Sequence, residues 1–246
     1  MDNFPIYGDE DRQLYLSYWY ERLSRHLLHM KPIPPEKWFE EKGRNHYDID
    51  ADALNAYIEV KAAANTDQLK LFDSQLDAQL AELGFPVDDG FVWIFGYRNR
   101  GNTGDRERLL KRVGGKSWET LSVFLAENTN VAYFLDIRLL DLLRKRNGTY
   151  SYTRDKFNTR AVVTLNRTGL KDLAEDARRG LGEIGISSDD LPRWLPPNAK
   201  RFRTRTIETE FDGRSVSFQL VLLTPNGFKN RFLRQLNGTV KRNGTS

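Results

Sequence analysis

The stretch that decides the fold is 56–97, and its first eight residues, 56–63, read AYIEVKAA. The aromatic and β-branched residues of this segment favour a strand. Residues 66–83 repeat leucine and phenylalanine at intervals of three and four, which predicts a helix. Residues 91–97, FVWIFGY, are almost wholly apolar, as in a strand buried on both faces. The order strand, helix, strand predicts a crossover connection between two mainly parallel strands.

Two charged residues interrupt the apolar pattern of the first strand. Glu59 and Lys61 are two positions apart, so on a strand their side chains share a face, with Cα atoms roughly 7 Å apart. Asp48 and Asp50 share a face in the same way on a short strand expected at 46–51. Pairing of the two strands would bring one of these aspartates close to Glu59. Two carboxylates placed together would bind Mg²⁺ through oxygen and leave positions for water and a phosphate.

This combination of groups suits the hydrolysis of a phosphodiester. The metal would lower the pKa of a bound water and neutralise charge on the phosphate, and Lys61 would hold the water and stabilise the developing negative charge. The Glu-x-Lys pattern of residues 59–61 is weak evidence for a catalytic site by itself. Glu40-Glu41-Lys42 has the same pattern in a segment whose composition indicates solvated surface. The alternative for Glu59 and Lys61 is a salt bridge on an edge strand.

The pattern resembles the PD-(D/E)xK nuclease superfamily, which includes many restriction endonucleases and the archaeal Holliday junction resolvases. Residues 47–51, YDIDA, match the first acidic strand and residues 58–61, IEVK, match the second. A helix and a hydrophobic strand follow in the family's order. Tyr47 stands where the family has a proline before the first acid. The resemblance covers about residues 15–97.

The resemblance implies a fold and a set of site residues. The fold is α/β, a restriction-endonuclease-like mixed sheet flanked by helices, and the cofactor is Mg²⁺ with Mn²⁺ as a substitute. Asp48, Glu59 and Lys61 match the catalytic residues. Asp48 and Glu59 are the expected metal ligands, with Asp50 as the alternative to Asp48.

Two further site residues are implied by the resemblance alone. The family often has a glutamate on its first helix that contacts the metal through water, and Glu21 matches it on the helix expected at 9–29. Many members have a glutamine on the helix after the lysine strand. Gln68, Gln75 and Gln79 form a stripe on that helix, and Gln75 is chosen because Gln68 is expected to cap it. The alternative for Glu21 and Gln75 is an ordinary position on a helix surface.

Three basic segments favour DNA as the partner, in a chain with a formal net charge of +4 and a pI of about 9.2. The first follows the apolar strand directly, the second is Arg144-Lys145-Arg146, and the third alternates so that its arginines share one strand face. The residues expected to contact DNA are Arg98, Arg100, Arg106, Lys111 and Arg112 in the first segment, and Arg201, Arg203 and Arg205 in the third.

The sequence of the second half of the chain predicts further strands and helices around the core. We place the nuclease-like core at 1–115 and a DNA-contacting region at 116–246, in the same domain or beside it. Strands at 201–211 and 215–224 are expected to form a hairpin around Asp212-Gly213, a favoured tight-turn pair.

Several classes of protein are excluded by composition. The 246 residues include no cysteine, so disulfides, cysteine nucleophiles and thiolate zinc sites are absent. The histidines are His26, His29 and His46, too few at suitable spacing for a histidine zinc site. No stretch approaches ~18 apolar residues and the N-terminus has no signal-peptide pattern, so we expect no membrane contact and a cytoplasmic, nucleoid-associated location.

The sequence therefore predicts a Mg²⁺-dependent endodeoxyribonuclease, sequence-specific and of the restriction type, that acts as a homodimer on double-stranded DNA. Two alternatives remain. One is a structure-specific repair or recombination nuclease acting on branched DNA, and the other is a DNA-binding protein in which Glu59 and Lys61 are only structural.

Overall fold

The computed structural model describes residues 9–41, 47–63, 73–83, 89–97, 118–138, 141, 152–154, 161–163, 204–224 and 226–236. The elements in chain order are α1 (Asp9–Leu27), α2 (Pro35–Glu41), β1 (Ile49–Ala51), a short 3-10 turn η1 (Asp52–Leu54), β2 (Ala56–Ala63), α3 (Asp73–Glu82), β3 (Asp89–Tyr97), α5 (Trp118–Asn128), β4 (Thr129–Asp136), β5 (Tyr152–Arg154), β6 (Ala161–Val163), β7 (Thr204–Phe211), β8 (Arg214–Leu223) and α9 (Asn226–Leu236).

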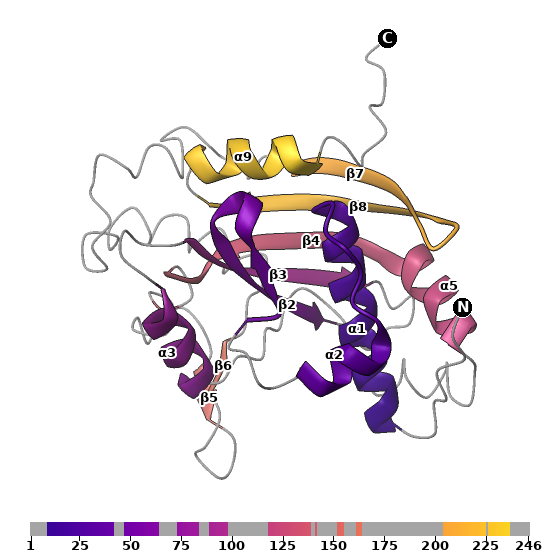
Figure 1. Cartoon of the computed structure of the whole chain (residues 1–246), viewed down its shortest axis with the longest axis horizontal. Helices are drawn as coiled ribbons and strands as arrows, with labels where there is room; N and C mark the ends of the chain where they lie inside the picture. The colour runs from indigo at the N-terminus through magenta and orange to yellow at the C-terminus, as the bar shows by residue number, and fades with distance from the viewer. Residues whose placement is uncertain are drawn as a thin grey trace.

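The centre of the molecule is a six-stranded mixed sheet in the order β1-β2-β3-β4-β8-β7 (Figure 1). The pairs β2–β3 and β4–β8 are parallel, and the other three neighbouring pairs are antiparallel. The sheet takes strands from both sides of residue 115, so that position does not separate two sheets. A mixed α/β fold is thereby confirmed. β5 and β6 form a separate antiparallel pair.

The crossover predicted from 56–97 is present. β2 pairs with β3 in parallel along its whole length, from Ala56 opposite Asp89 to Ala63 opposite Gly96. The described part of the connection contains α3, which lies within the helix that the spacing of leucine and phenylalanine predicts at 66–83. On its other side β2 pairs with β1 over Ala56–Ile58, and this ladder stops before Glu59.

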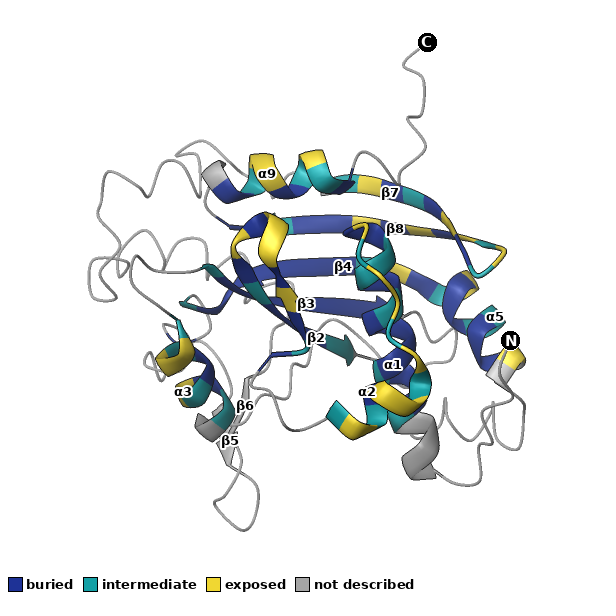
Figure 2. Ribbon diagram, in the orientation of Figure 1, coloured by how far each residue is buried: buried dark blue, intermediate teal, exposed yellow. Residues whose placement is uncertain are grey.

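One face of the sheet is covered by α1, α5 and α9, and the main core lies there (Figures 1 and 2). Phe228 of α9 stacks on Phe91 of β3 with ring centroids 3.9 Å apart, and Phe232 stacks on Phe134 of β4 at 4.3 Å. Tyr20 of α1 stacks on Phe95 at 5.0 Å. Burying aromatic rings of this size dominates the stability of such a core.

The hairpin predicted around Asp212-Gly213 is confirmed. β7 and β8 pair in antiparallel register from Thr204 opposite Val221 to Phe211 opposite Arg214. Asp212 and Gly213 both have positive φ, 51° and 70°, as a two-residue type I′ turn requires.

The other described element boundaries lie close to those predicted. α1 ends at Leu27 rather than residue 29, because His29 adopts the left-handed conformation at φ 57°. α9 spans Asn226–Leu236, in agreement with the short helix that the residue pattern predicts at 226–236. The pattern also predicts a helix at 169–184, and these residues lie outside the described ranges. None of the helices in the described ranges is long and apolar enough to cross a lipid bilayer.

Candidate active site

Glu59 and Lys61 project from β2 on the face away from the main core. Alternation along the strand sends Ile58 and Val60 into the core and leaves Tyr57, Glu59 and Lys61 on the other side. The Lys61 ammonium forms an ion pair with Oε1 of Glu59. Glu59 is only 3% exposed, whereas the Lys61 side chain is 27% exposed. The carboxylate is therefore buried beside a cation that reaches solvent.

Two glutamines from α3 hold the Glu59 carboxylate through side-chain hydrogen bonds. Nε2 of Gln75 donates to Oε1 at 2.9 Å, and Nε2 of Gln79 donates to Oε2 at 3.0 Å. The two glutamines are one helical turn apart, so both reach the same carboxylate. The structure thus brings both Gln75 and Gln79 into contact with Glu59. Gln79 belongs to the same stripe of glutamines, and its spacing of four from Gln75 is the sequence signal that points to it.

Burial raises the pKa of Glu59 above that of an ordinary glutamate, and the negative charge of Asp48 raises it further. The Lys61 ammonium and the hydrogen bond from Gln75 act in the opposite direction. The site thus concentrates negative charge where water is excluded, which is an environment that a cation would stabilise.

Asp48 lies just before β1 and close enough to Glu59 for its negative charge to raise the pKa of that carboxyl. The antiparallel β1–β2 ladder ends at Ile49 opposite Ile58, and continuing this register by one residue would set Asp48 opposite Glu59. Oδ2 of Asp48 accepts a hydrogen bond of 2.7 Å from the backbone N–H of Val60. Asp50 is exposed and pairs with Tyr57, two positions from Glu59. The register therefore favours Asp48 over Asp50 as the partner of Glu59.

Tyr47, which lies two residues before β1, ties this end of the strand to its neighbours. Its hydroxyl donates to the main-chain oxygen of Gln79 at 2.9 Å, and its ring stacks on Tyr57 at 5.3 Å. A Cβ on Gly90 of β3 would lie 2.9 Å from the Tyr47 hydroxyl oxygen, so a larger residue there would require the tyrosine to shift. Tyr47 thereby holds α3 next to the strand that carries Glu59.

Glu21 is buried beneath α2 and does not lie on an open helix surface. Its Oε2 accepts a hydrogen bond from the indole N–H of Trp38, and its Oε1 accepts one from Nε of Arg25 at 3.0 Å. Burial raises the pKa of Glu21 to about 7, with a further contribution from the charge of Asp48, and these effects outweigh the hydrogen bonds. Glu21 is thus electrostatically coupled to the site through Asp48.

The carboxylate oxygens at this site are the type of ligand that a hard divalent cation prefers. Among the described residues, no group of three or more histidine, aspartate or glutamate side chains is close enough to hold a metal ion. Asp48 and Glu59 offer two carboxylates, and Mg²⁺ in phosphate chemistry is held by one or two carboxylates, with waters and substrate oxygens completing its octahedron. In this arrangement Asp48 and Glu59 would hold the cation, and waters and a phosphate would supply the rest.

The expected DNA-contacting residues fall mostly outside the described ranges. These are Arg98, Arg100, Arg106, Lys111, Arg112, Arg201 and Arg203. Arg205 is described, and it is partly buried on β7 opposite Leu220. It shares its strand face with the fully buried Ile207, so it lies toward the core side of the sheet.

Two residues of the network, Arg25 and Trp38, are not predicted from the sequence. Arg25 joins α1 to Asp48, just before β1, and Trp38 joins α2 to Glu21 of α1. Such contacts depend on how separate elements pack together. Comparison of the chain with protein-family models, with curated proteins and with solved structures yields no match.

Proposed function

We propose that this chain is a Mg²⁺-dependent endodeoxyribonuclease of the restriction type, active as a homodimer on double-stranded DNA. The observation that carries the proposal is the buried Glu59 carboxylate, which is paired with Lys61 on its own strand and lies near Asp48, whose carboxylate accepts the backbone N–H bond of the adjacent Val60. A purely structural sheet has no need for two carboxylates and an ammonium at one point.

Each residue has a distinct role in the proposed reaction. Asp48 and Glu59 would hold the cation, which when bound supplies an activated water and neutralises charge on the scissile phosphate. Lys61, which reaches solvent, orients the attacking water and stabilises the negative charge that develops on the phosphate. Gln75 and Gln79 fix the rotamer of Glu59, so that its oxygens are already oriented before DNA arrives.

A direct experiment compares substrates and metals. Supercoiled plasmid, linear duplexes of varied sequence and a four-way junction are incubated with the protein in Mg²⁺, in Mn²⁺ or in EDTA. The proposal expects metal-dependent cleavage of duplex DNA into discrete fragments. Cleavage of the junction with linear duplex left intact would instead assign the structure-specific repair or recombination class. Absence of cleavage on every substrate with either metal would contradict a nuclease.

One observation favours the non-catalytic DNA-binding alternative. Both oxygens of Glu59 already have partners within the protein, from Lys61, Gln75 and Gln79, so the carboxylate is satisfied without a cation. Lys61→Ala separates the two functions, because it removes the proposed catalytic ammonium while leaving both glutamine bonds to Glu59. A nuclease loses cleavage and keeps DNA binding in a gel-shift assay. Lys37→Ala, which breaks the exposed ion pair with Glu41, is the matched control.

A further inference from the structure

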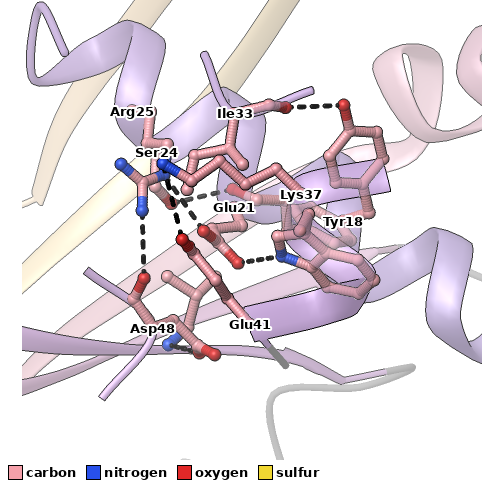
Figure 3. A network of polar contacts seen from close by, with 11 residues as sticks. Tyr18, Glu21, Ser24, Arg25, Ile33, Lys37, Glu41 and Asp48 are labelled. Atoms are coloured by element: carbon pink, nitrogen blue, oxygen red, sulfur yellow. Dashed lines mark hydrogen bonds and ion pairs between the residues drawn. The ribbon is translucent and has the colours of Figure 1, made fainter. Parts of the chain in front are cut away.

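Arg25 of α1 joins two of the acidic residues at the site. Its Nε donates to Oε1 of Glu21 at 3.0 Å, and its Nη2 donates to the main-chain oxygen of Asp48 at 3.2 Å. Figure 3 shows the guanidinium reaching from the helix toward both residues. The side chain is 12% exposed, so these hydrogen bonds are largely shielded from water.

Glu21 is engaged on both of its oxygens. Arg25 occupies Oε1 and the indole of Trp38 occupies Oε2, and the residue is 5% exposed. Glu21 and Arg25 are four residues apart on one helix, the spacing at which such pairs meet. The geometry therefore assigns Glu21 a task other than contact with a metal-bound water: it holds the guanidinium of Arg25 in place.

Asp48 depends on contacts from outside the strand ladder. It precedes β1, so its position is not fixed by a β1–β2 backbone pair. Arg25 holds its main-chain oxygen and the Val60 N–H holds its carboxylate, one contact on each side of the residue. Loss of the first contact would remove the side-chain hydrogen bond that joins the main chain of Asp48 to α1.

We propose that Arg25 is a positioning residue, anchored by Glu21 and Trp38, that sets the Asp48 carboxylate opposite Glu59 for cation binding. The role toward the cation rests on the function proposed above, whereas the positioning of Asp48 can be measured in the metal-free protein. Groups that orient a ligand in this way affect metal affinity by about 10- to 100-fold.

The test uses two readouts that do not require cleavage. The first is hydrogen exchange of the Val60 amide by NMR in EDTA, compared with the amide of Trp93 in the neighbouring strand β3. The second is the affinity for Mn²⁺, measured by the electron paramagnetic resonance signal of the free ion. Arg25→Ala is expected to speed exchange at Val60 relative to Trp93 and to weaken Mn²⁺ binding by about tenfold.

Controls separate positioning from general loss of stability. Arg22→Ala, three residues away on α1, breaks a bidentate pair with Asp212 on the hairpin. It should leave the ratio of Val60 to Trp93 exchange and the Mn²⁺ affinity unchanged. Arg25→Lys keeps the positive charge but lacks the planar guanidinium that reaches two partners at once. Its exchange ratio and Mn²⁺ affinity should therefore lie between those of wild type and Arg25→Ala. If Arg25→Ala does not fold, Trp38→Phe removes the second bond to Glu21 and is expected to shift both readouts in the same direction by a smaller factor.

The outcomes distinguish the two proposals. Folded Arg25→Ala with wild-type exchange at Val60 and wild-type Mn²⁺ affinity overturns the positioning role. Faster Val60 exchange in a protein that binds Mn²⁺ but cuts no DNA supports the positioning role and contradicts the nuclease. A wild type that binds no Mn²⁺ overturns the cation site, and exchange at Val60 then decides alone whether Arg25 positions Asp48.

Discussion

The Asp48 carboxylate accepts a hydrogen bond of 2.7 Å from the backbone N–H of Val60. A side chain just before β1 therefore bonds the main chain of β2 beyond the end of the β1–β2 ladder. The contact fixes Asp48 near Glu59 and leaves Asp50 exposed on the strand itself. Two aspartates that are alike in sequence therefore differ in their relation to the site.

The first prediction follows from this difference. Asp48→Asn keeps an oxygen for the Val60 N–H but removes the charge that would hold the cation, so cleavage should fall by about 10²-fold or more with the fold retained. Asp50→Asn should cleave as wild type does. The measurement is the initial rate of plasmid cleavage in Mg²⁺. Equal cleavage rates for Asp48→Asn and Asp50→Asn would contradict the choice of Asp48 over Asp50 as the ligand of the cation.

The second prediction concerns the glutamines above Glu59. Gln79→Met preserves volume but leaves Oε2 of a buried carboxylate without its donor, which should cost about 1–3 kcal/mol of unfolding free energy. Gln75 is only half-buried, so Gln75→Met should cost less. Urea unfolding at fixed pH measures both. A smaller loss for Gln79→Met than for Gln75→Met would contradict this account of how Glu59 is held.

The third prediction separates stability from activity. Arg22 donates two hydrogen bonds to the Asp212 carboxylate, at 2.9 and 2.7 Å, and so ties α1 to the β7–β8 turn. Arg22→Ala should lower the unfolding free energy by about 1–3 kcal/mol because a part-buried bidentate pair is lost. Cleavage per folded molecule should not change, since the pair lies at the hairpin. A drop in cleavage larger than the loss of folded protein would show that the hairpin contributes to the site.

The fourth prediction is a dependence of stability on pH. The pKa of Glu21 is raised to about 7 in the folded chain from an ordinary value of 4.5, so between these values the unfolded chain releases a proton that the folded chain keeps. The contribution of Glu21 to stability therefore falls as pH rises from about 4.5 to about 7, and is constant outside that window.

Glu21→Gln removes this titration. The stability of the variant relative to wild type, measured by urea unfolding in EDTA, should increase between pH 5 and pH 8. Glu41→Gln, on the exposed pair with Lys37, should show no such change relative to wild type. Parallel curves for wild type and Glu21→Gln across this range would contradict the raised pKa.

Local patterns explain which parts of the fold were predictable. The parallel pair β2–β3 follows from 56–97 because strand, helix and strand are consecutive, and the type I′ hairpin follows from Asp212-Gly213. The parallel pairing of β4 with β8 joins Val131 to Gln219, and no local pattern reports a contact over that distance in sequence.

The candidate site divides in the same way. Glu59, Lys61 and Gln75 come together because strand and helix periodicity place them on facing surfaces. Arg25 and Trp38 were not predicted, because their partners lie on other elements whose packing sets the contact. The choice of Asp48 over Asp50 likewise needed the β1–β2 register.

The most direct test of the central claim is single-turnover cleavage of plasmid DNA in Mg²⁺ by wild type, Glu59→Gln and Glu119→Gln. Glu119 is an exposed glutamate paired with Arg214, so its substitution makes the same chemical change away from the site. The account predicts that Glu59→Gln binds DNA and remains folded but loses cleavage by about 10²-fold or more, while Glu119→Gln cleaves at the wild-type rate. Cleavage by folded Glu59→Gln at the wild-type rate would contradict it.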